Sequence, residues 1–373
     1  MAAGRRIRIL IVDDSVVMRS LLRSVVSADQ RLEVVGSAAD GESALRNIQT
    51  LGPDLVLLDV EMPVMDGLVT LREMRARGHK MPVIMCSSLT QRGATVTIEA
   101  LAGGASDYVA KPTGQSGRDA AALSLTQELL PKIFALTSQA SQPAGPAVRT
   151  PLILPMTPRF KPQPVSSNPV LVVIGVSTGG PAALEQLLTA IPGNFALPIL
   201  IVQHMPELFT KLFAERLNSR CALQVKEAAE GDPVRPGTIY IAKGNWHMEI
   251  QKSAHPSAPA TLHLTQAPPE NHCRPAVDAL FRSAAAIYGS GVLAVILTGM
   301  GSDGLVGSRL VREQGGSVLA QDQATSVVWG MPGAVTNAGL AQKVLPLNAI
   351  APEILRIASR TNSEARELRE SAV

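Results

Sequence analysis

The sequence has few aromatic residues, few cysteines and no long hydrophobic run. Aromatic residues make up only 3% of its 373 residues, and no lysine and arginine run is interleaved with them, so we expect no nucleic-acid partner. The three cysteines, Cys86, Cys221 and Cys273, are scattered and odd in number. This usage is typical of reduced thiols in a cytoplasm and not of a disulfide framework.

The longest apolar stretches, such as 292–297, fall far short of the roughly 20 residues that cross a bilayer. The first residues carry Arg5, Arg6 and Arg8 before a short apolar run that lacks a small-residue cleavage site, so we expect no signal peptide here. We therefore expect a cytoplasmic protein with no direct membrane insertion. Because single cores stop growing beyond about 250–300 residues, a chain of this length predicts two domains.

Two α/β patterns are separated by a proline-rich segment. Apolar runs at 7–12, 32–36, 55–58, 83–86 and 108–110 alternate with helical periodicity and predict a doubly wound parallel sheet. Runs at 171–174, 198–203, 238–242, 293–297 and 317–320 predict a second parallel sheet. We expect domains at 1–137 and 170–362, a semi-stiff linker at 138–169 and a frayed, charged tail at 363–373.

Acidic residues follow the strands expected in the first half. Asp13 and Asp14 follow the first strand and Asp59 ends the third, while Ser87 ends the fourth and Lys111 the fifth. Parallel strands place their carboxyl ends on one edge of the sheet, so these groups should meet there. Clustered carboxylates suit Mg²⁺, Lys111 can bind phosphoryl oxygens, and Asp59 is the natural nucleophile. Taken singly, each acid is more often an ordinary loop cap and Lys111 a solvated lysine, but five such groups at strand ends make that interpretation the weaker one.

The motifs Val12-Asp-Asp-Ser15, Leu58-Asp-Val-Glu-Met-Pro-Val-Met-Asp-Gly67 and Lys111-Pro112 resemble the response-regulator receiver domain, a flavodoxin-like fold. The resemblance implies that a histidine kinase phosphorylates Asp59. It implies a magnesium site in which Asp14, Asp59 and the backbone carbonyl of Glu61 bind Mg²⁺ and Asp13 supports it through water. It also implies that Ser87 and Lys111 form the switch pair.

Gly175-Val-Ser-Thr-Gly179 follows a predicted strand and precedes a predicted helix, as a nucleophile elbow does. Flanking glycines permit the tight turn that would expose the Ser177 hydroxyl. A phosphate-binding loop is the rival interpretation, although no lysine follows at Walker spacing. His204 ends the next strand as a candidate base, and Asp303 lies in a glycine-rich turn as its orienting acid.

The second half resembles the chemotaxis protein-glutamate methylesterase family in five motifs. They are Ile174-Gly-Val-Ser-Thr-Gly-Gly180, Gln203-His-Met-Pro206, His272-Cys-Arg-Pro-Ala-Val-Asp278, Leu297-Thr-Gly-Met-Gly-Ser-Asp-Gly304 and Gly330-Met-Pro332. The resemblance implies Ser177 as nucleophile, His204 as general base, Asp303 as orienting acid and the Met300 backbone N–H in the oxyanion hole. One departure is Lys243, which replaces a proline usual in that family.

The two resemblances together imply a phosphorylation-activated serine hydrolase. It would demethylate glutamate γ-methyl esters on methyl-accepting chemoreceptors, deamidate receptor glutamines, and need no cofactor for ester hydrolysis. A chemotaxis histidine kinase would be its phosphodonor, and an interface between receiver and catalytic domains would restrain access to Ser177. Three alternatives stay open: a module that only binds a partner, an esterase for a small metabolite, and a metal site formed by the scattered histidines and Cys273.

Overall fold

The computed structural model describes residues 5–112, 117–138, 169–253, 255 and 258–370. The chain divides into two compact units, Met1–Ala147 and Val148–Val373, and each is described by itself. Most of the proline-rich segment that we expect to be a linker, 139–168, lies outside the described residues. In the described part of the chain, no helix is both long and apolar enough to span a membrane.

The first unit contains a five-stranded sheet in the order β2-β1-β3-β4-β5, and its strand pairs are parallel. This is the flavodoxin-like order. The strands are β1 (Ile7–Val12), β2 (Leu32–Ala38), β3 (Leu55–Asp59), β4 (Val83–Ser87) and β5 (Asp107–Ala110). The helices are α1 (Val16–Ser27), α2 (Gly41–Leu51), α3 (Gly67–Ala76), α4 (Gln91–Ala102) and α5 (Arg118–Ser138).

The helices of the first unit pack in two groups. Helix α1 contacts α5, whereas α3 contacts both α2 and α4. Four helices begin at a side chain that accepts a hydrogen bond from a backbone N–H three residues ahead, and these residues are Ser15, Asp40, Asp66 and Thr90. Each such cap contributes about 1 kcal/mol to stability. The caps therefore fix where each helix starts relative to the preceding strand end.

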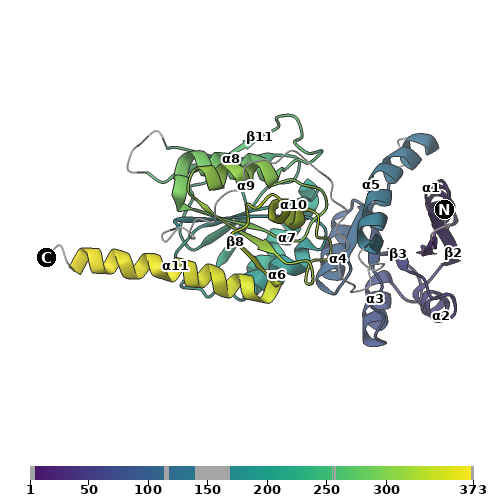
Figure 1. Ribbon diagram of the computed structural model, residues 1–373. Coiled ribbons are helices and arrows are strands. Elements are labelled where there is room, and N and C mark those ends of the chain that lie inside the picture. The colour runs from purple at the N-terminus through teal and green to yellow at the C-terminus, as the bar shows by residue number, and fades with distance from the viewer. Residues whose placement is uncertain (1–4, 113–116, 139–168, 254, 256–257, 371–373) are drawn as a thin grey trace, which may run out of the picture. The chain divides into compact units, whose positions relative to one another are not determined.

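The second unit contains a seven-stranded sheet in the order β14-β13-β12-β6-β7-β9-β8, again with parallel pairs (Figure 1). The strands are β6 (Leu171–Val176), β7 (Ile199–Gln203), β8 (Gln224–Glu227), β9 (Thr238–Ile241), β12 (Val292–Ile296), β13 (Ser317–Gln321) and β14 (Lys343–Leu345). The helices are α6 (Gly180–Thr189), α7 (Glu207–Arg220), α8 (Val277–Tyr288), α9 (Leu305–Glu313), α10 (Met331–Asn337) and α11 (Leu347–Glu370). A separate antiparallel pair joins β10 (His247–Gln251) and β11 (Thr261–Thr265).

The central strands of the second sheet, β6, β7 and β12, are buried along their whole length. Their side chains pack with Phe281 and neighbouring residues of α8 in the hydrophobic core. Burying each large apolar side chain contributes about 1.5–3 kcal/mol, so the centre of the sheet is the most strongly held part of this unit. The residues that follow β6, β7 and β12 are thus mounted on a rigid platform.

The apolar runs predicted as strands are confirmed as β1 to β7, β9, β12 and β13. The prediction missed β8, β14 and the β10–β11 pair. The prediction of a frayed tail was wrong for most of that segment, because α11 continues to Glu370 (Figure 1). Alanine, leucine, arginine and glutamate fill this stretch, and these residues are strong helix formers.

Candidate active site and phosphoacceptor site

Two aspartates and a lysine form a buried ionic cluster at the carboxyl edge of the first sheet. The Lys111 Nζ lies 2.8 Å from Asp13 Oδ2 and 2.7 Å from Asp59 Oδ1. Asp13 and Asp59 are 0% and 3% exposed, whereas Asp14 is exposed. One carboxylate oxygen from each of Asp13, Asp14 and Asp59 falls within 4.8 Å of the others. The structure therefore brings together the carboxylates that the sequence predicted would meet.

The electrostatics of this cluster favour a cation. Burial raises the pKa of Asp59 to about 6, against the opposing effect of Lys111, and the charge of Asp13 raises it further. Burial also opposes the charge on Lys111, but its bonds to Asp13 and Asp59 outweigh burial and raise its pKa. Carboxylate oxygens at this spacing fit Mg²⁺, because a divalent cation would relieve the repulsion between them. Glu61 contributes a backbone N–H that lies 3.4 Å from Asp59 Oδ1.

The expected switch pair is joined through backbone atoms. The Lys111 N–H donates to the Ser87 carbonyl at 2.7 Å. The Ser87 hydroxyl donates to the Ser88 carbonyl at 3.1 Å and accepts from Thr97 Oγ1 at 2.7 Å. The described contacts of this hydroxyl therefore run toward α4. To donate to a phosphoryl oxygen on Asp59, this hydroxyl would have to give up its bond to the Ser88 carbonyl.

Ser177 occupies a sharp turn between β6 and α6. The turn is closed by a hydrogen bond from the Gly180 N–H to the Ser177 carbonyl at 2.8 Å, and Gly179 has a φ of 77°. A side chain on Gly179 would collide with Val327, which is why glycine is needed there. Ser177 itself remains half-buried. The strand, turn and helix therefore have the form of a nucleophile elbow.

His204 ends the neighbouring strand and pairs with Asp303. Its Nε2 lies 2.8 Å from Asp303 Oδ2, and its Nδ1 lies 3.5 Å from the Cys273 Sγ. The side chain of Gln203 also links His204 to the Ser177 segment, since its Nε2 donates to the backbone carbonyls of Ser177 at 3.1 Å and His204 at 3.2 Å. The described hydrogen bonds of the imidazole do not include the Ser177 hydroxyl. The structure brings the candidate base and the candidate orienting acid together and places the candidate nucleophile, Ser177, on the adjacent strand end.

The His204–Asp303 pair shifts both pKa values. Burial lowers the pKa of His204, but its contacts with Asp303 and Cys273 outweigh burial and raise it to about 9. Burial raises the pKa of Asp303, yet the bond to His204 and two backbone N–H groups lower it overall. An acid that stays ionised beside a base that holds its proton firmly is the arrangement that orients an imidazole.

Asp303 also caps a helix. It accepts backbone N–H bonds from Val277 at 2.7 Å and Asp278 at 3.0 Å, at the start of α8. The residue before this helix, Ala276, has no polar side chain that could do so. In return Asp278 Oδ1 accepts the N–H of Gly307 in α9 at 2.6 Å. Asp303 thus caps the helix that contains Asp278, and Asp278 bonds the first turn of the helix that follows Asp303. These bonds fix the position of the Asp303 carboxylate.

Asn271 bridges the two aspartates. Its Nδ2 donates to Asp278 Oδ2 at 3.0 Å and to Asp303 Oδ1 at 3.0 Å. Burial and the charge of Asp303 raise the pKa of Asp278 to about 6. Sequence reasoning missed the roles of Asn271 and Asp278. The available signal was the position of Asp278 in the first turn of a helix whose preceding residue cannot cap it.

The sequence is similar to known proteins in both of its units. Residues 172–354 match the model described as CheB methylesterase, and residues 9–120 match the response regulator receiver domain. A protein-glutamate methylesterase/protein-glutamine glutaminase of Nocardioides sp. is 51% identical over 95% of this chain and 96% of its own. The chain belongs to the CheB methylesterase family.

A second relative supports the same assignment. A relative of the same name from Trichodesmium erythraeum is 47% identical over 94% of this chain and 99% of its own. The crystal structure of the Thermotoga maritima CheB methylesterase catalytic domain is 44% identical, covers 51% of this chain and 99% of its own, and has a TM-score of 0.49.

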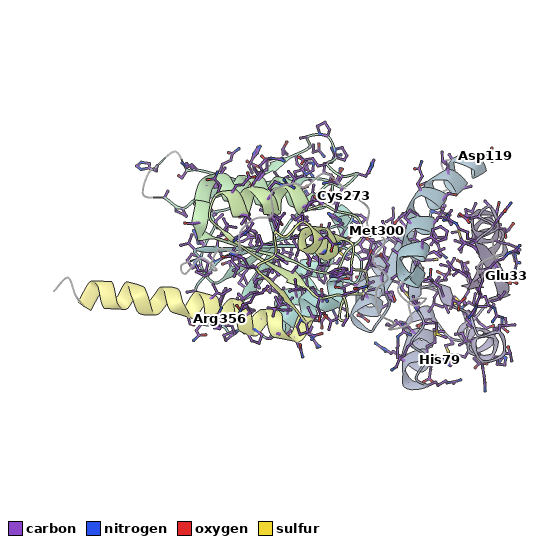
Figure 2. The ribbon with its side chains drawn as sticks, in the orientation of Figure 1. Glu33, His79, Asp119, Cys273, Met300 and Arg356 are labelled. Carbon is purple, nitrogen blue, oxygen red and sulfur yellow. The ribbon has the colours of Figure 1, made fainter. Side chains whose placement is uncertain are left out.

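Met300, which the resemblance to the CheB methylesterase family assigns to the oxyanion hole, lies in a turn beside the Ser177 elbow. Gly299 packs so closely against Ser177 that a side chain on it would lie 2.9 Å from the Ser177 Cβ. Met300 follows directly and is 37% exposed (Figure 2). The turn is held because Gly330 and Met331 donate to the Gly299 carbonyl at 3.0 and 2.9 Å. The Met300 backbone therefore belongs to the same rigid turn as Asp303.

Other candidates for chemistry have structural partners. His247 accepts the Ala276 N–H at 3.2 Å, and His263 pairs with Glu230 at 3.1 Å. Arg274 donates to Asn245 Oδ1 at 2.7 Å and to two backbone carbonyls. Among the described residues, the one group arranged to hold a metal consists of the three aspartates of the first unit. The structure thus gives no support to a metal site built from histidines.

Proposed function

We propose that this protein is a phosphorylation-controlled methylesterase that hydrolyses glutamate γ-methyl esters on chemoreceptors and deamidates receptor glutamines. The 2.8 Å contact between His204 and Asp303, next to the elbow that presents Ser177, carries the proposal. The names of the relatives agree with it. The same reaction chemistry serves both substrates, since an ester and an amide differ at the leaving group.

In the proposed mechanism the Ser177 oxygen attacks the ester carbonyl carbon while His204 takes the hydroxyl proton. Asp303 accepts the hydrogen bond of the His204 Nε2–H, so Nδ1 is the nitrogen that receives the proton and must exchange its Cys273 contact for Ser177. The Met300 N–H stabilises the oxyanion. His204 then gives this proton to the departing methoxide, which leaves as methanol, or to the departing amide nitrogen, which leaves as ammonia. Water then hydrolyses the acyl-enzyme, with His204 again taking the proton.

For the first unit, we propose that Asp59 accepts the phosphoryl group of a histidine kinase. Asp13, Asp14, Asp59 and the Glu61 carbonyl would hold Mg²⁺, which neutralises charge on the incoming phosphoryl group when it is bound. Lys111 is near enough to Asp59, at 2.7 Å, to bind a phosphoryl oxygen there. The Ser87 hydroxyl would then exchange its bond to the Ser88 carbonyl for one to the new anion, and this change is the proposed switch.

Control of the esterase requires the two units to communicate. We propose that the receiver restrains access to Ser177 and that phosphorylation weakens this interface in a cytoplasmic protein. A tether keeps the local receiver concentration at roughly millimolar, so a weak interface suffices. Comparing the full chain with a chain truncated before Val165 tests this control. The truncated chain should be more active than the unphosphorylated full chain, and equal activity would contradict restraint.

The deciding experiment measures methanol released from methylated receptor membranes, with and without a small phosphodonor. Ser177→Ala should lose up to about 10⁶-fold in rate with no change in thermal stability. Asp59→Asn should keep the basal rate and lose the response to phosphodonor. A Ser177→Ala protein that still releases methanol would contradict the mechanism.

A further inference from the structure

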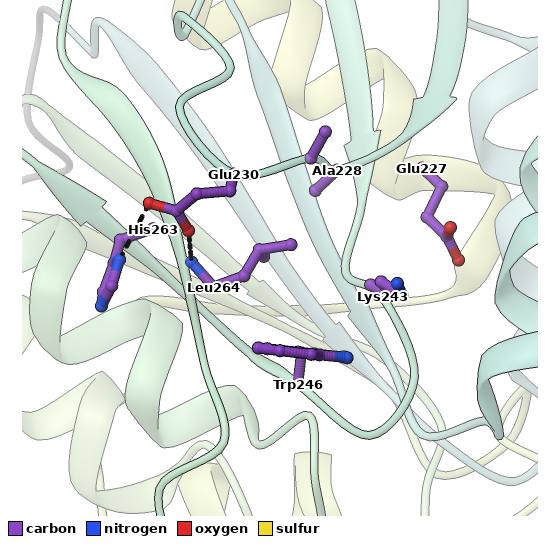
Figure 3. A pocket seen from close by; sticks show the side chains of 8 residues that line it. Glu227, Ala228, Glu230, Lys243, Trp246, His263 and Leu264 are labelled. Carbon is purple, nitrogen blue, oxygen red and sulfur yellow. Dashed lines mark hydrogen bonds and ion pairs between the residues drawn. The ribbon is translucent and has the colours of Figure 1, made fainter.

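A pocket of about 490 Å³ lies in the second unit, where β8 and β9 end (Figure 3). Glu227, Ala228 and Ala229 line it from the end of β8, and Lys243 and Trp246 from the loop after β9. Leu264 lines it from β11. We call this the Trp246 pocket. Its volume falls in the range of sites that accept ligand groups.

The charged groups around the Trp246 pocket already have partners within the chain. Lys243 Nζ lies 2.8 Å from Glu207, and Glu227 Oε1 accepts the Thr210 hydroxyl at 2.6 Å. Glu230 accepts the Leu264 N–H at 2.6 Å. A charged side chain entering the pocket would have to displace one of these bonds. An uncharged apolar group would displace none of them.

The apolar part of the lining is exposed to the pocket. Figure 3 shows the flat indole of Trp246 and the side chain of Leu264 along one side, with Ala228 across from them. Trp246 and Leu264 are both half-buried. The ammonium of Lys243 lies 5.6 Å from the centre of the Trp246 ring and helps to hold the indole in place. The pocket therefore offers a fixed aromatic face.

The Trp246 pocket lies on the same edge of the sheet as the catalytic residues. Strands β6, β7, β9 and β8 are neighbours in that order and run parallel, so the segments after each strand share one edge. With neighbouring strands about 4.8 Å apart, the pocket lies roughly 10–14 Å from Ser177. An extended peptide covers this distance in about three or four residues.

The pocket is also fixed to segments that contact His204. The Gly244 N–H donates to Thr210 Oγ1 at 3.0 Å, and Thr210 lies in the first turn of α7, just after His204. On the other side, the Asn245 N–H donates to the Arg274 carbonyl at 3.1 Å. Arg274 follows Cys273, which contacts His204. The loop that carries Trp246 is therefore held in a constant position relative to the catalytic imidazole.

We propose that the Trp246 pocket is a substrate subsite that takes an aliphatic or aromatic side chain of the substrate protein, a few residues from the glutamyl ester. The proposal rests on the proposed function, because it needs a polypeptide substrate bound at Ser177. A short ester cannot reach the pocket. The subsite consequently makes the enzyme favour a glutamyl ester within a polypeptide over an isolated ester.

The test compares kcat/KM for methylated receptor membranes with kcat/KM for N-acetylglutamate γ-methyl ester amide. Trp246→Ala removes the indole, and Ala229→Trp fills the pocket from an exposed position without removing core contacts. Each should lower the receptor-to-ester ratio about tenfold, mainly through a higher KM for receptor. Trp246→Phe should restore most of the ratio. Val306→Ala removes an exposed apolar side chain on α9, outside the pocket, and should leave the ratio unchanged.

The outcomes separate the subsite from the proposed function. A wild-type protein that releases no methanol from receptor would overturn the proposed function itself. A wild-type protein that is active, with an unchanged ratio and receptor KM in both pocket variants, would overturn the subsite alone. Equal loss on both substrates would also overturn it, because that result indicates general damage. If the short ester is too poor a substrate to measure, a raised receptor KM at constant kcat supports the subsite and a constant KM overturns it.

Discussion

Asp303 contacts His204 through the same carboxylate oxygen, Oδ2, that caps α8. The distance to His204 Nε2 is 2.8 Å, and the distance to the Val277 N–H is 2.7 Å. One atom therefore orients the proposed base and holds the start of a helix. Catalysis and folding of this half of the protein are coupled at that oxygen.

Substitution of Asp303 should separate these two roles. Asp303→Asn keeps an oxygen that can cap α8 but loses the charge that orients His204, so we expect activity to fall by roughly 10³–10⁴-fold with a small change in stability. Asp303→Ala also loses the cap and should cost a further 1–2 kcal/mol or so in the free energy of unfolding. Methanol release and thermal melting of both variants check this. Equal melting temperatures would contradict the capping role.

The pH profile should reflect the raised pKa of His204. The base must be neutral to take a proton, and its pKa is about 9, so kcat/KM should rise with pH toward that value. In Asp303→Asn the midpoint should move toward lower pH, because the charge that holds the proton is gone. Rate measurements from pH 6 to 10 test this. A wild-type midpoint near 6.5, unchanged in the variant, would contradict it.

The hydrogen bonds from Asn271 should influence the pKa values of the two aspartates that they join. Asn271→Ala removes the donor shared by Asp278 and Asp303, so these carboxylates repel each other and the pKa of Asp278 should rise further. We expect kcat to fall about tenfold, with an altered pH profile. Asn271→Ser, which retains a donor, should recover part of the rate. An unchanged pH profile in Asn271→Ala would show that the bridge is only structural.

Magnesium should stabilise the first unit in a pH-dependent way. Asp59 has a folded pKa of about 6 against an ordinary value of 3.8, so its contribution to stability is present at low pH and is lost as pH rises through 6. Above pH 6 the ionised cluster repels, and Mg²⁺ should relieve that repulsion. The melting temperature should therefore rise more with Mg²⁺ at pH 8 than at pH 5. An equal rise in melting temperature with Mg²⁺ at pH 5 and pH 8 would contradict a site at these carboxylates. The same pH-dependent rise in Asp59→Asn would also contradict it.

The sequence predicted the centre of each sheet because central parallel strands are continuous apolar runs, as in 171–174 and 293–297. It did not predict β8, whose residues Gln-Val-Lys-Glu form a short edge strand with little apolar signal. Strands β10 (His-Met-Glu-Ile-Gln) and β11 (Thr-Leu-His-Leu-Thr) alternate polar and apolar residues, but each is short and holds only two apolar side chains, and their partner is each other. Pairing of this kind depends on tertiary contacts that local pattern does not encode.

The candidate site was predicted in part. Residues at strand ends, such as His204 and Asp59, follow from the parallel topology. The capping of α8 by Asp303 joins residues 26 apart in sequence, and no local pattern predicts it. The direction of the Ser87 hydroxyl, toward Thr97, likewise depends on a rotamer set by packing. Sequence reasoning located the groups, and the structure was needed to find what holds them.

The double use of Asp303 also bears on how this protein can lose activity over evolutionary time. A mutation at Ser177 removes a half-buried hydroxyl from a turn whose shape depends on its glycines, so the fold survives it. A mutation at Asp303 removes the cap of α8 as well, so selection for folding alone preserves this carboxylate. Inactive descendants that keep the fold should therefore have lost the serine and retained the aspartate.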